Sequence, residues 1–225
     1  MIIAIVQARL DSKRLPNKCL LSLKGLSVIE WIYKRLKKSK RIQKLIFAIP
    51  ENKINDSLEI SLKKIGANVI RGSNENVLSR YNKCLLVHKN ITHIIRVCAD
   101  RPLVDWGSID LLVQEHLASK ADYSYNHYPL ENNWPIGFGA EICSYETFKK
   151  IYKNAKTNLQ KEHIFNYLVE NANRFKIHTF DTNMGVDNDI KLDLDTYDDY
   201  LRLIQLNINS NMPMGKILSE VGAGI

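Results

Sequence analysis

The stretch IIAIVQARLDSKRLPNK, residues 2–18, decides the fold prediction for this chain. Residues 2–6 form a short apolar run rich in β-branched side chains, which is typical of a strand buried on both faces of a sheet. The chain then becomes polar, and Pro16-Asn17 is a turn signal. Ligands of open α/β sheets bind at the carboxyl ends of the strands. The stretch therefore predicts a first buried strand that leads directly into a ligand-binding loop.

The loop contains four cations, which indicate the kind of ligand it would bind: Arg9, Lys13, Arg14 and Lys18. An Arg side chain can hold phosphate oxygens bidentately, and a Lys acts as a point charge. Four cations within ten residues favour an anion with several charges, such as a triphosphate. The alternative is a solvated basic loop that follows a strand and binds nothing.

Strand-like and helix-like segments alternate over the first half of the chain. Ser27 and Glu30 have the spacing of a capping box, so we expect a helix to begin there. Further strands are expected at residues 44–49, 68–70 and 92–97, and further helices at residues 54–65, 74–89 and 108–119. This order predicts an α/β fold, with a mostly parallel sheet and helices on both of its faces.

The regular alternation of strand-like and helix-like segments ends after residue 121, although no linker separates a second domain. Further extended segments are expected at 122–128, 136–143, 175–180 and 190–194, and helices at 145–154, 161–171, 196–206 and 214–221. We therefore treat residues 1–225 as a single domain, in which residues 207–225 are a C-terminal extension.

Composition limits the class of protein. The 225 residues are 45% hydrophobic, which is enough for one substantial core. No apolar run is long enough to span a bilayer, and the N-terminal run lacks the features of a signal peptide, so we expect no membrane association. The four cysteines are widely spaced and suggest neither a zinc site nor disulfides. Reduced thiols favour a cytoplasmic protein.

The net charge of +8 permits a polyanionic partner. Much of the excess lies in the basic run at residues 34–41, which is typical of a solvated helix face. The chain has no interleaved aromatics, RNA-binding motif or zinc-finger spacing. We therefore expect no nucleic acid partner, and a nucleic-acid binder remains an alternative on charge alone.

Two carboxylates are candidate magnesium ligands. Asp100 ends a predicted buried strand and is followed by Arg101-Pro102, so it would face the same crevice as the basic loop. Mg²⁺ prefers a few carboxylates together with phosphate oxygens. Asp195 precedes a predicted helix and is the second candidate, although either Asp could instead cap a helix. Because side chains alternate along a strand, we expect Asp193 to face away from Asp195.

Three other places are weaker candidates for a site. They are Glu162-His163 on a predicted helix, Arg71 after a short strand, and Glu141 after a glycine-rich segment. Each has an ordinary structural alternative, which is a surface position, a surface ion pair or a buried salt bridge. The chain has no P-loop, no dinucleotide-binding glycine loop and no nucleophile elbow. This argues against a P-loop ATPase, a nicotinamide dehydrogenase and an α/β-hydrolase.

Residues 5–20, IVQARLDSKRLPNKCL, resemble the opening signature of cytidylyltransferases that activate acidic sugars. These include the CMP-Kdo and CMP-sialic acid synthetases, and the resemblance is closest to the SpsF-like branch, with its pattern QAR-x-x-S-x-RLP-x-K. Weaker matches continue in order to about residue 205. The chain departs from the pattern at Asp11 and Asn17, where the family often has Gly, and at Tyr197, where Pro is common.

The resemblance implies a Rossmann-like nucleotidyltransferase fold and Mg²⁺-dependent transfer of CMP from CTP to a sugar, with release of pyrophosphate. By carry-over, the nucleotide would contact Gln7, Ala8, Arg9, Ser12, Arg14, Lys18, Arg71 and Asp100. Arg9, Arg14, Lys18 and Asp100 would be catalytic, Asp100 and Asp195 would hold Mg²⁺, and Glu141, Glu162 and His163 would bind the sugar.

The resemblance also implies an acidic 2-keto sugar, Kdo-like or nonulosonate-like, in the biosynthesis of a surface polysaccharide or glycan. Family members are commonly homodimers, and residues 123–138 would form the arm that completes the neighbour's sugar site. Two alternatives remain: a glycosyltransferase or other nucleotide-sugar enzyme on a related fold, and cytidylyl transfer to a phosphorylated acceptor.

Overall fold

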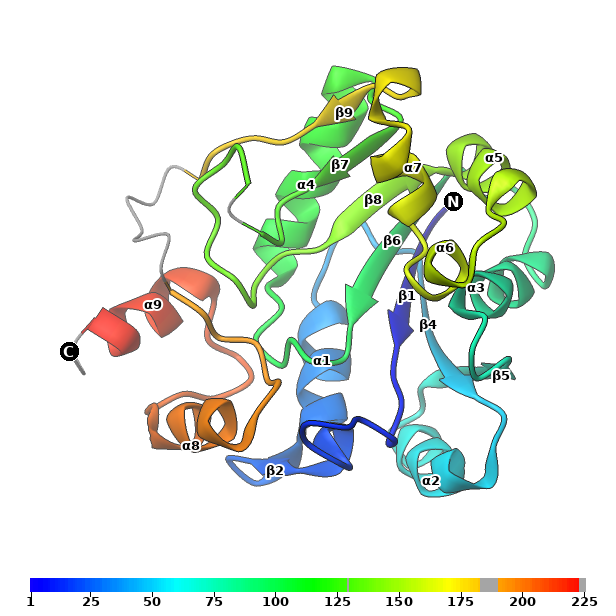
Figure 1. Cartoon of the computed structure of the whole chain (residues 1–225). Helices are drawn as coiled ribbons and strands as arrows, with labels where there is room; N and C mark the ends of the chain where they lie inside the picture. The colour runs from blue at the N-terminus through cyan, green and yellow to red at the C-terminus, as the bar shows by residue number, and fades with distance from the viewer. Residues whose placement is uncertain (129, 183–189, 223–225) are drawn as a thin grey trace.

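A seven-stranded sheet runs through the molecule in the order β5-β4-β1-β6-β8-β7-β9 (Figure 1). The computed structural model describes residues 1–128, 130–182 and 190–222. The strands of the sheet are β1 (Ile2–Gln7), β4 (Lys44–Pro50), β5 (Asn68–Gly72), β6 (His93–Cys98), β7 (Tyr123–Tyr125), β8 (Glu141–Ser144) and β9 (Ile177–His178). A small antiparallel hairpin, β2 (Ser22–Leu23) with β3 (Leu26–Ser27), lies outside this sheet and was not predicted.

The sheet is mostly parallel, as predicted. β5, β4, β1 and β6 pair in parallel, β8 is antiparallel to both of its neighbours, and β9 is parallel to β7. The prediction of a strand at residues 190–194 is wrong. That segment makes one isolated bridge, between Ile136 and Lys191, because its partner Ile136 belongs to a loop and continues no ladder.

β1 is an interior strand of the sheet, with β4 on one side and β6 on the other. Its residues Ile3, Ala4, Ile5 and Val6 have no exposed surface, which confirms the prediction of a strand buried on both faces. Ile3 and Ile5 contribute to one core, and Ala4 and Val6 to the other. Because β1 and β6 run in parallel, their carboxyl ends lie at the same edge of the sheet.

Helices cover both faces of the sheet (Figure 1). On the Ala4 face lie α1 (Val28–Leu36), α2 (Asp56–Lys64), α4 (Trp106–Ser119), α8 (Tyr197–Gln205) and α9 (Met214–Gly222). On the Ile3 face lie α3 (Val77–Leu86), α5 (Tyr145–Asn154), α6 (Asn158–Glu162) and α7 (Asn166–Glu170).

Local signals place several helix ends. Ser27 and Glu30 form the predicted capping box at the start of α1, and Thr196 and Asp199 form another at the start of α8. The single helix expected at residues 161–171 is instead split into α6 and α7. His163 has extended backbone angles, so the following Ile164 and Phe165 turn into the core, where they are 0% and 4% exposed.

Residues 123–138, the expected dimerisation arm, begin as strand β7 and then fold back on their own chain. Trp134 is 1% exposed, and its indole N–H donates to the carbonyl oxygen of Phe180 at 2.8 Å. The Asn132 amide donates to Thr179 Oγ1 at 2.8 Å. Burial within its own core stabilises an aromatic side chain of this size, and the role of this segment as a dimerisation arm stays a prediction.

The C-terminal extension is integrated into the fold. Ile208, Met214 and Ile217 are buried in the core on the α1 side. The fully buried Arg35 donates to the carbonyl oxygen of Met212 at 2.6 Å and to Asp105 Oδ1 at 3.2 Å. In the described residues, none of the helices combines the length and apolar character needed to cross a membrane.

Candidate active site

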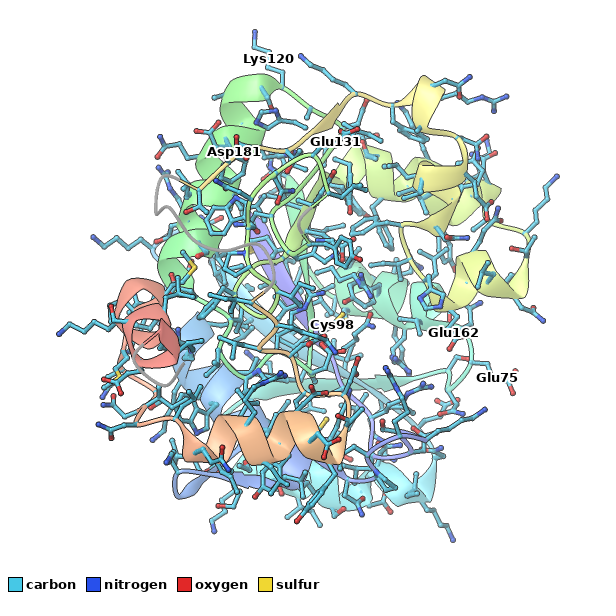
Figure 2. The ribbon with its side chains drawn as sticks, turned by 60° about the vertical axis from the view of Figure 1, so that its left-hand side comes forward. Glu75, Cys98, Lys120, Glu131, Glu162 and Asp181 are labelled. Carbon is cyan, nitrogen blue, oxygen red and sulfur yellow. The ribbon has the colours of Figure 1, made fainter. Side chains whose placement is uncertain are left out.

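A cleft of about 460 Å³ opens at the carboxyl edge of β1 and β6. It is lined by Gln7, Ala8, Arg9, Ser12, Lys13, Arg14, Lys18, Cys19, Val77, Arg80, Arg96, Cys98, Ala99, Asp100, Glu162, His163 and Asp195. Figure 2 labels Cys98 near the middle of the view and Glu162 to the right of it. The cleft therefore brings together most of the residues that the resemblance implied for the site.

The basic loop is held in shape by a few local contacts. Leu10 and Leu15 are buried, and the Leu10 N–H donates to the side chain of Asn55 at 2.9 Å. Asn17 closes the loop through a 2.9 Å bond from its N–H to the carbonyl oxygen of Leu10. Asn17 has a φ of 58°, a left-handed conformation that Asn tolerates better than most residues, so it can replace the Gly that is common here. Arg9 Nε lies 3.7 Å from Asp11 Oδ1.

Lys18 connects this loop to both predicted magnesium ligands. Its Nζ lies 3.0 Å from Asp195 Oδ1, 3.8 Å from Asp100 Oδ2 and 2.9 Å from the carbonyl oxygen of Leu194. Arg14 Nη2 lies 2.8 Å from Asp195 Oδ2. Burial raises the pKa of Asp195, but the hydrogen bond and charge of Lys18 together with Arg14 outweigh it and lower that pKa. Asp195 therefore stays ionised.

The helix-cap alternative does not hold for either carboxylate. The side chain that caps α8 belongs to Thr196, and the side chain that caps α4 belongs to Asp105. Asp100 and Asp195 are thus free of a capping role and lie at the two sides of the Lys18 ammonium.

The prediction that Asp193 faces away from Asp195 is wrong. Residues two positions apart in an extended segment share a face, and here Leu192 and Leu194 are the buried pair that points the other way. Burial raises the pKa of Asp193, and the charges of Asp195 and Asp100 raise it further, whereas Lys191 opposes the shift. Asp193 therefore belongs to the same acidic cluster as the other two.

The acidic cluster suits a hard divalent cation. Asp100 Oδ1 and Asp193 Oδ1 are both buried and have no hydrogen-bond partner in the part of the chain that the structure describes. Within residues 1–128, 130–182 and 190–222, no group of three His, Cys, Asp or Glu has the geometry to hold a metal unaided. Mg²⁺ usually takes only one or two carboxylates and completes its shell with substrate phosphates and water, so the residues fit that ion.

Arg71 and Glu141 are two corrections to the expected site. The Arg71 guanidinium lies 2.7 Å from both Asp56 and Glu59 of α2 and does not line the cleft, because β5 ends on the α2 side of the sheet. Glu141 forms an ion pair with Arg96 and is only 4% exposed. Neither side chain is placed to contact a ligand in the cleft directly.

A family model described as "Cytidylyltransferase" matches residues 3–210. The chain belongs to the cytidylyltransferase family. An uncharacterized protein of Methanocaldococcus jannaschii is 34% identical over 207 residues, which cover 91% of this chain and 82% of that protein. The spore coat polysaccharide biosynthesis protein SpsF of Bacillus subtilis is 32% identical over 172 residues, covering 74% and 69%. The resemblance seen in the sequence is thereby confirmed.

Solved structures agree with this assignment. A cytidylyltransferase from Leptospira borgpetersenii superposes with a TM-score of 0.89 at 26% identity, and the match covers 99% of this chain and 94% of that one. A CMP:2-keto-3-deoxy-manno-octonic acid synthetase complexed with CTP has a TM-score of 0.66 at 13% identity, with 91% and 97% covered. At that identity the second likeness shows the fold alone.

The cytidylyltransferase cleft also contains arginines to which the sequence pattern had given no role. Arg80 is 2% exposed, and its Nη1 donates to the carbonyl oxygen of Ser73 at 2.8 Å. Gly72 makes room for it, since a Cβ at that position would lie 3.1 Å from Arg80 Cγ. One sequence feature could have pointed to Arg80, namely that it is a charged residue beside the apolar face of the helix predicted at 74–89. Arg96, on β6, is the second of these arginines.

Proposed function

We propose that this cytidylyltransferase transfers CMP from CTP to an acidic 2-keto sugar and releases pyrophosphate. The observation that carries the proposal is the position of Lys18, between Asp195 and Asp100, under a loop of further cations. Cytidylyl transfer needs cations along the leaving pyrophosphate and carboxylates beside the reacting phosphorus, and this cleft offers both.

The basic loop would bind the triphosphate. Displacement at the α-phosphorus depends on alignment and on neutralising charge, and it needs little covalent help from the protein. Lys18 is the best-positioned cation, since its side chain is 13% exposed and its ammonium is held by three oxygens. Arg9 and Arg14 are more exposed, so they would close on phosphate oxygens when the nucleotide binds.

Asp100 and Asp195 would hold Mg²⁺, with Asp193 beside them. When bound, that ion would neutralise charge on the phosphates and acidify the attacking hydroxyl. The chain's own contribution is to keep Asp195 ionised, because Lys18 and Arg14 lower the pKa of that carboxyl. Removal of either carboxylate would also leave Lys18 without one of its fixed partners.

The acceptor would lie toward Glu162 and His163, which line the cleft at the end of α6. The choice of an acidic sugar is supported by the relatives. One is a 3-deoxy-manno-octulosonate cytidylyltransferase of Fusobacterium nucleatum, 30% identical over 120 residues that cover 52% of this chain and 47% of that protein. The SpsF relative supports a role in making a surface polysaccharide.

The direct test is a screen for pyrophosphate release. CTP, UTP, ATP and GTP are each combined with 3-deoxy-manno-octulosonate, N-acetylneuraminate or glucose 1-phosphate, with Mg²⁺, and the CMP-sugar product is identified by mass spectrometry. We expect release with CTP and one of the 2-keto acids, and release that is slower by about 10² to 10³-fold from the Lys18→Ala variant. Equal release from all four nucleotides, or release only with the sugar phosphate, would contradict the proposal.

We further propose that the enzyme forms a homodimer. The expectation comes from the family resemblance, and the exposed Tyr128 and Leu130 are apolar side chains that a partner would cover. Light scattering after size exclusion should give a mass near twice 25.9 kDa. A single monomer mass at all concentrations would contradict it.

A further inference from the structure

Arg96 and Glu141 are direct cross-strand neighbours on β6 and β8. Arg96 Nη1 forms an ion pair with Glu141 Oε2, and Arg96 Nε donates to Gln7 Oε1 at 3.2 Å. The hydroxyl of Tyr123 donates to the other carboxylate oxygen, Oε1, at 2.6 Å. The guanidinium is therefore held directly by Gln7 on β1 and Glu141 on β8 before any ligand arrives, and Tyr123 on β7 holds Glu141 in turn.

Glu141 is fully committed to this network. Both of its oxygens accept hydrogen bonds, and its side chain is 5% exposed. Burial alone would raise the pKa of Glu141, but Arg96, with smaller contributions from His127 and Tyr123, outweighs it and lowers that pKa to about 2. Glu141 is thus an anion whose two oxygens are both engaged by side chains of the protein.

Arg96 is not fully committed. Its third nitrogen, Nη2, makes no hydrogen bond within the described chain, and the side chain lines the cleft. Arg96 also belongs to the sheet floor, on the same face as Cys98, and not to the basic loop. Of the six Lys and Arg side chains that line the cleft, four belong to the basic loop, whereas Arg80 and Arg96 lie outside it.

We infer that Arg96 binds the oxyanion of the acceptor, a carboxylate or a phosphate, and that Glu141 is the positioning residue that holds its guanidinium. The inference rests on the proposed function and deepens it, since it names the group that recognises an acidic acceptor. It also explains how a glutamate expected to bind the sugar serves the site without touching it. A fixed guanidinium forms a stronger hydrogen bond to an oxyanion than a mobile one, because less side-chain freedom is lost on binding.

The cross-strand pair has a purely structural alternative, in which it only joins β6 to β8. Binding measurements separate the two roles. Calorimetric titrations use 3-deoxy-manno-octulosonate as the carboxylate probe, glucose 1-phosphate as the phosphate probe, sorbitol as the uncharged control, and CTP. The variants are Arg96→Met, Arg96→Lys and, as a matched control from outside the cleft, Arg71→Met, each checked for folding by circular dichroism.

We expect one acidic probe to bind the wild type and Arg71→Met equally well. Arg96→Met should weaken that binding by about tenfold or more, as expected for loss of a charge-assisted hydrogen bond, with Arg96→Lys in between. CTP affinity should stay within about threefold of the wild type, since the triphosphate is held by the loop. The probe that responds tells carboxylate recognition from phosphate recognition.

The Glu141 variants test the positioning role. Glu141→Ala should weaken binding of the acidic probe with little change for CTP, and Glu141→Gln, which keeps an oxygen for Arg96, should restore part of it. Unchanged acid binding in folded Arg96→Met, equal losses for acid and CTP, or a wild type that binds neither acid would each overturn the inference. Arg96-dependent acid binding without any pyrophosphate release from CTP would instead refute the proposed function alone.

Discussion

Lys18 and Asp195 are 177 positions apart in the sequence, yet Lys18 Nζ lies 3.0 Å from Asp195 Oδ1. The contact joins the loop after the first strand to the segment before α8, and the carbonyl oxygen of Leu194 accepts a second bond from the same ammonium. The cation proposed for the phosphates and the carboxylate proposed for the metal are thus in direct contact, and a change in either should disturb both proposed functions.

Lys18→Ala should reduce kcat/KM for CTP by about 10² to 10³-fold, the usual effect of removing one preorganised transition-state donor. Lys13→Ala is the matched control, because Lys13 belongs to the same loop but is exposed and makes no ion pair within the described residues. Its effect should stay below about threefold. Steady-state pyrophosphate release measures both, and comparable losses would show that the loop has been assigned wrongly.

Asp100→Asn and Asp195→Asn should each abolish turnover while the protein stays folded. Each change removes a charge that a cation beside the phosphates would need. Asp193→Asn should retain activity but require more Mg²⁺, since Asp193 adds charge to the cluster without lining the cleft. Turnover measured across a magnesium titration distinguishes the three. Normal turnover in folded Asp100→Asn would show that the metal ligands have been assigned wrongly.

Arg71→Ala should leave CTP binding unchanged. The guanidinium is engaged with Asp56 and Glu59 on the surface of α2, and partly exposed ion pairs of this kind contribute about 0–1 kcal/mol to stability. Calorimetry with CTP tests the expected binding, and urea unfolding tests the expected stability. A tenfold loss of CTP affinity would mean that Arg71 leaves its partners to contact the nucleotide.

Arg35→Met should destabilise the protein without changing its kinetics. Arg35 and Asp105 form a pair away from the cleft, with both side chains almost fully buried, and removal of one partner from such a pair costs about 3–5 kcal/mol. Exposed Arg41→Met, a neighbour in the same basic run, should change stability by less than about 0.5 kcal/mol. Urea unfolding gives both values. Equal stability of the two variants would be inconsistent with a buried network.

Stability should fall as the pH drops below neutral. Burial, with the charges of His93 and His178, lowers the pKa of His116 from 6.5 to about 4. Between those values the unfolded chain binds the proton and the folded chain does not, so each such group makes unfolding easier by about 1.4 kcal/mol per pH unit. Burial also lowers the pKa of His127 to about 4, which adds to the slope.

His116→Asn tests this dependence. The variant keeps a polar side chain opposite Ser124, which lies 2.8 Å from His116 Nδ1. Urea unfolding at pH 7.0, 6.0 and 5.0 should show a shallower loss of stability for the variant than for the wild type. Parallel pH profiles would show that His116 titrates normally in the folded protein.

Local patterns in the sequence were sufficient for much of this protein. The apolar run at residues 2–6 predicted strand β1, and the spacing of Ser27 and Glu30 predicted the start of α1. Both are decided by neighbours in the chain, that is, by burial of β-branched side chains and by hydrogen bonds three residues apart. The motif at residues 7–18 also identified the family and the basic loop of the cleft.

Only the tertiary structure decided which charged groups meet. Arg71 and Arg96 both lie in strands of the same sheet. Arg71 pairs with Glu59 of α2 and does not line the cleft, whereas Arg96 pairs with Glu141 and does line it. A charge near a site in the sequence finds its partner through strand order and packing, across distances along the chain that no local pattern records. Thus the sequence alone determined most strands of the main sheet, the basic loop and the family, whereas the fold decided which charged groups pair with each other and which of them line the cleft.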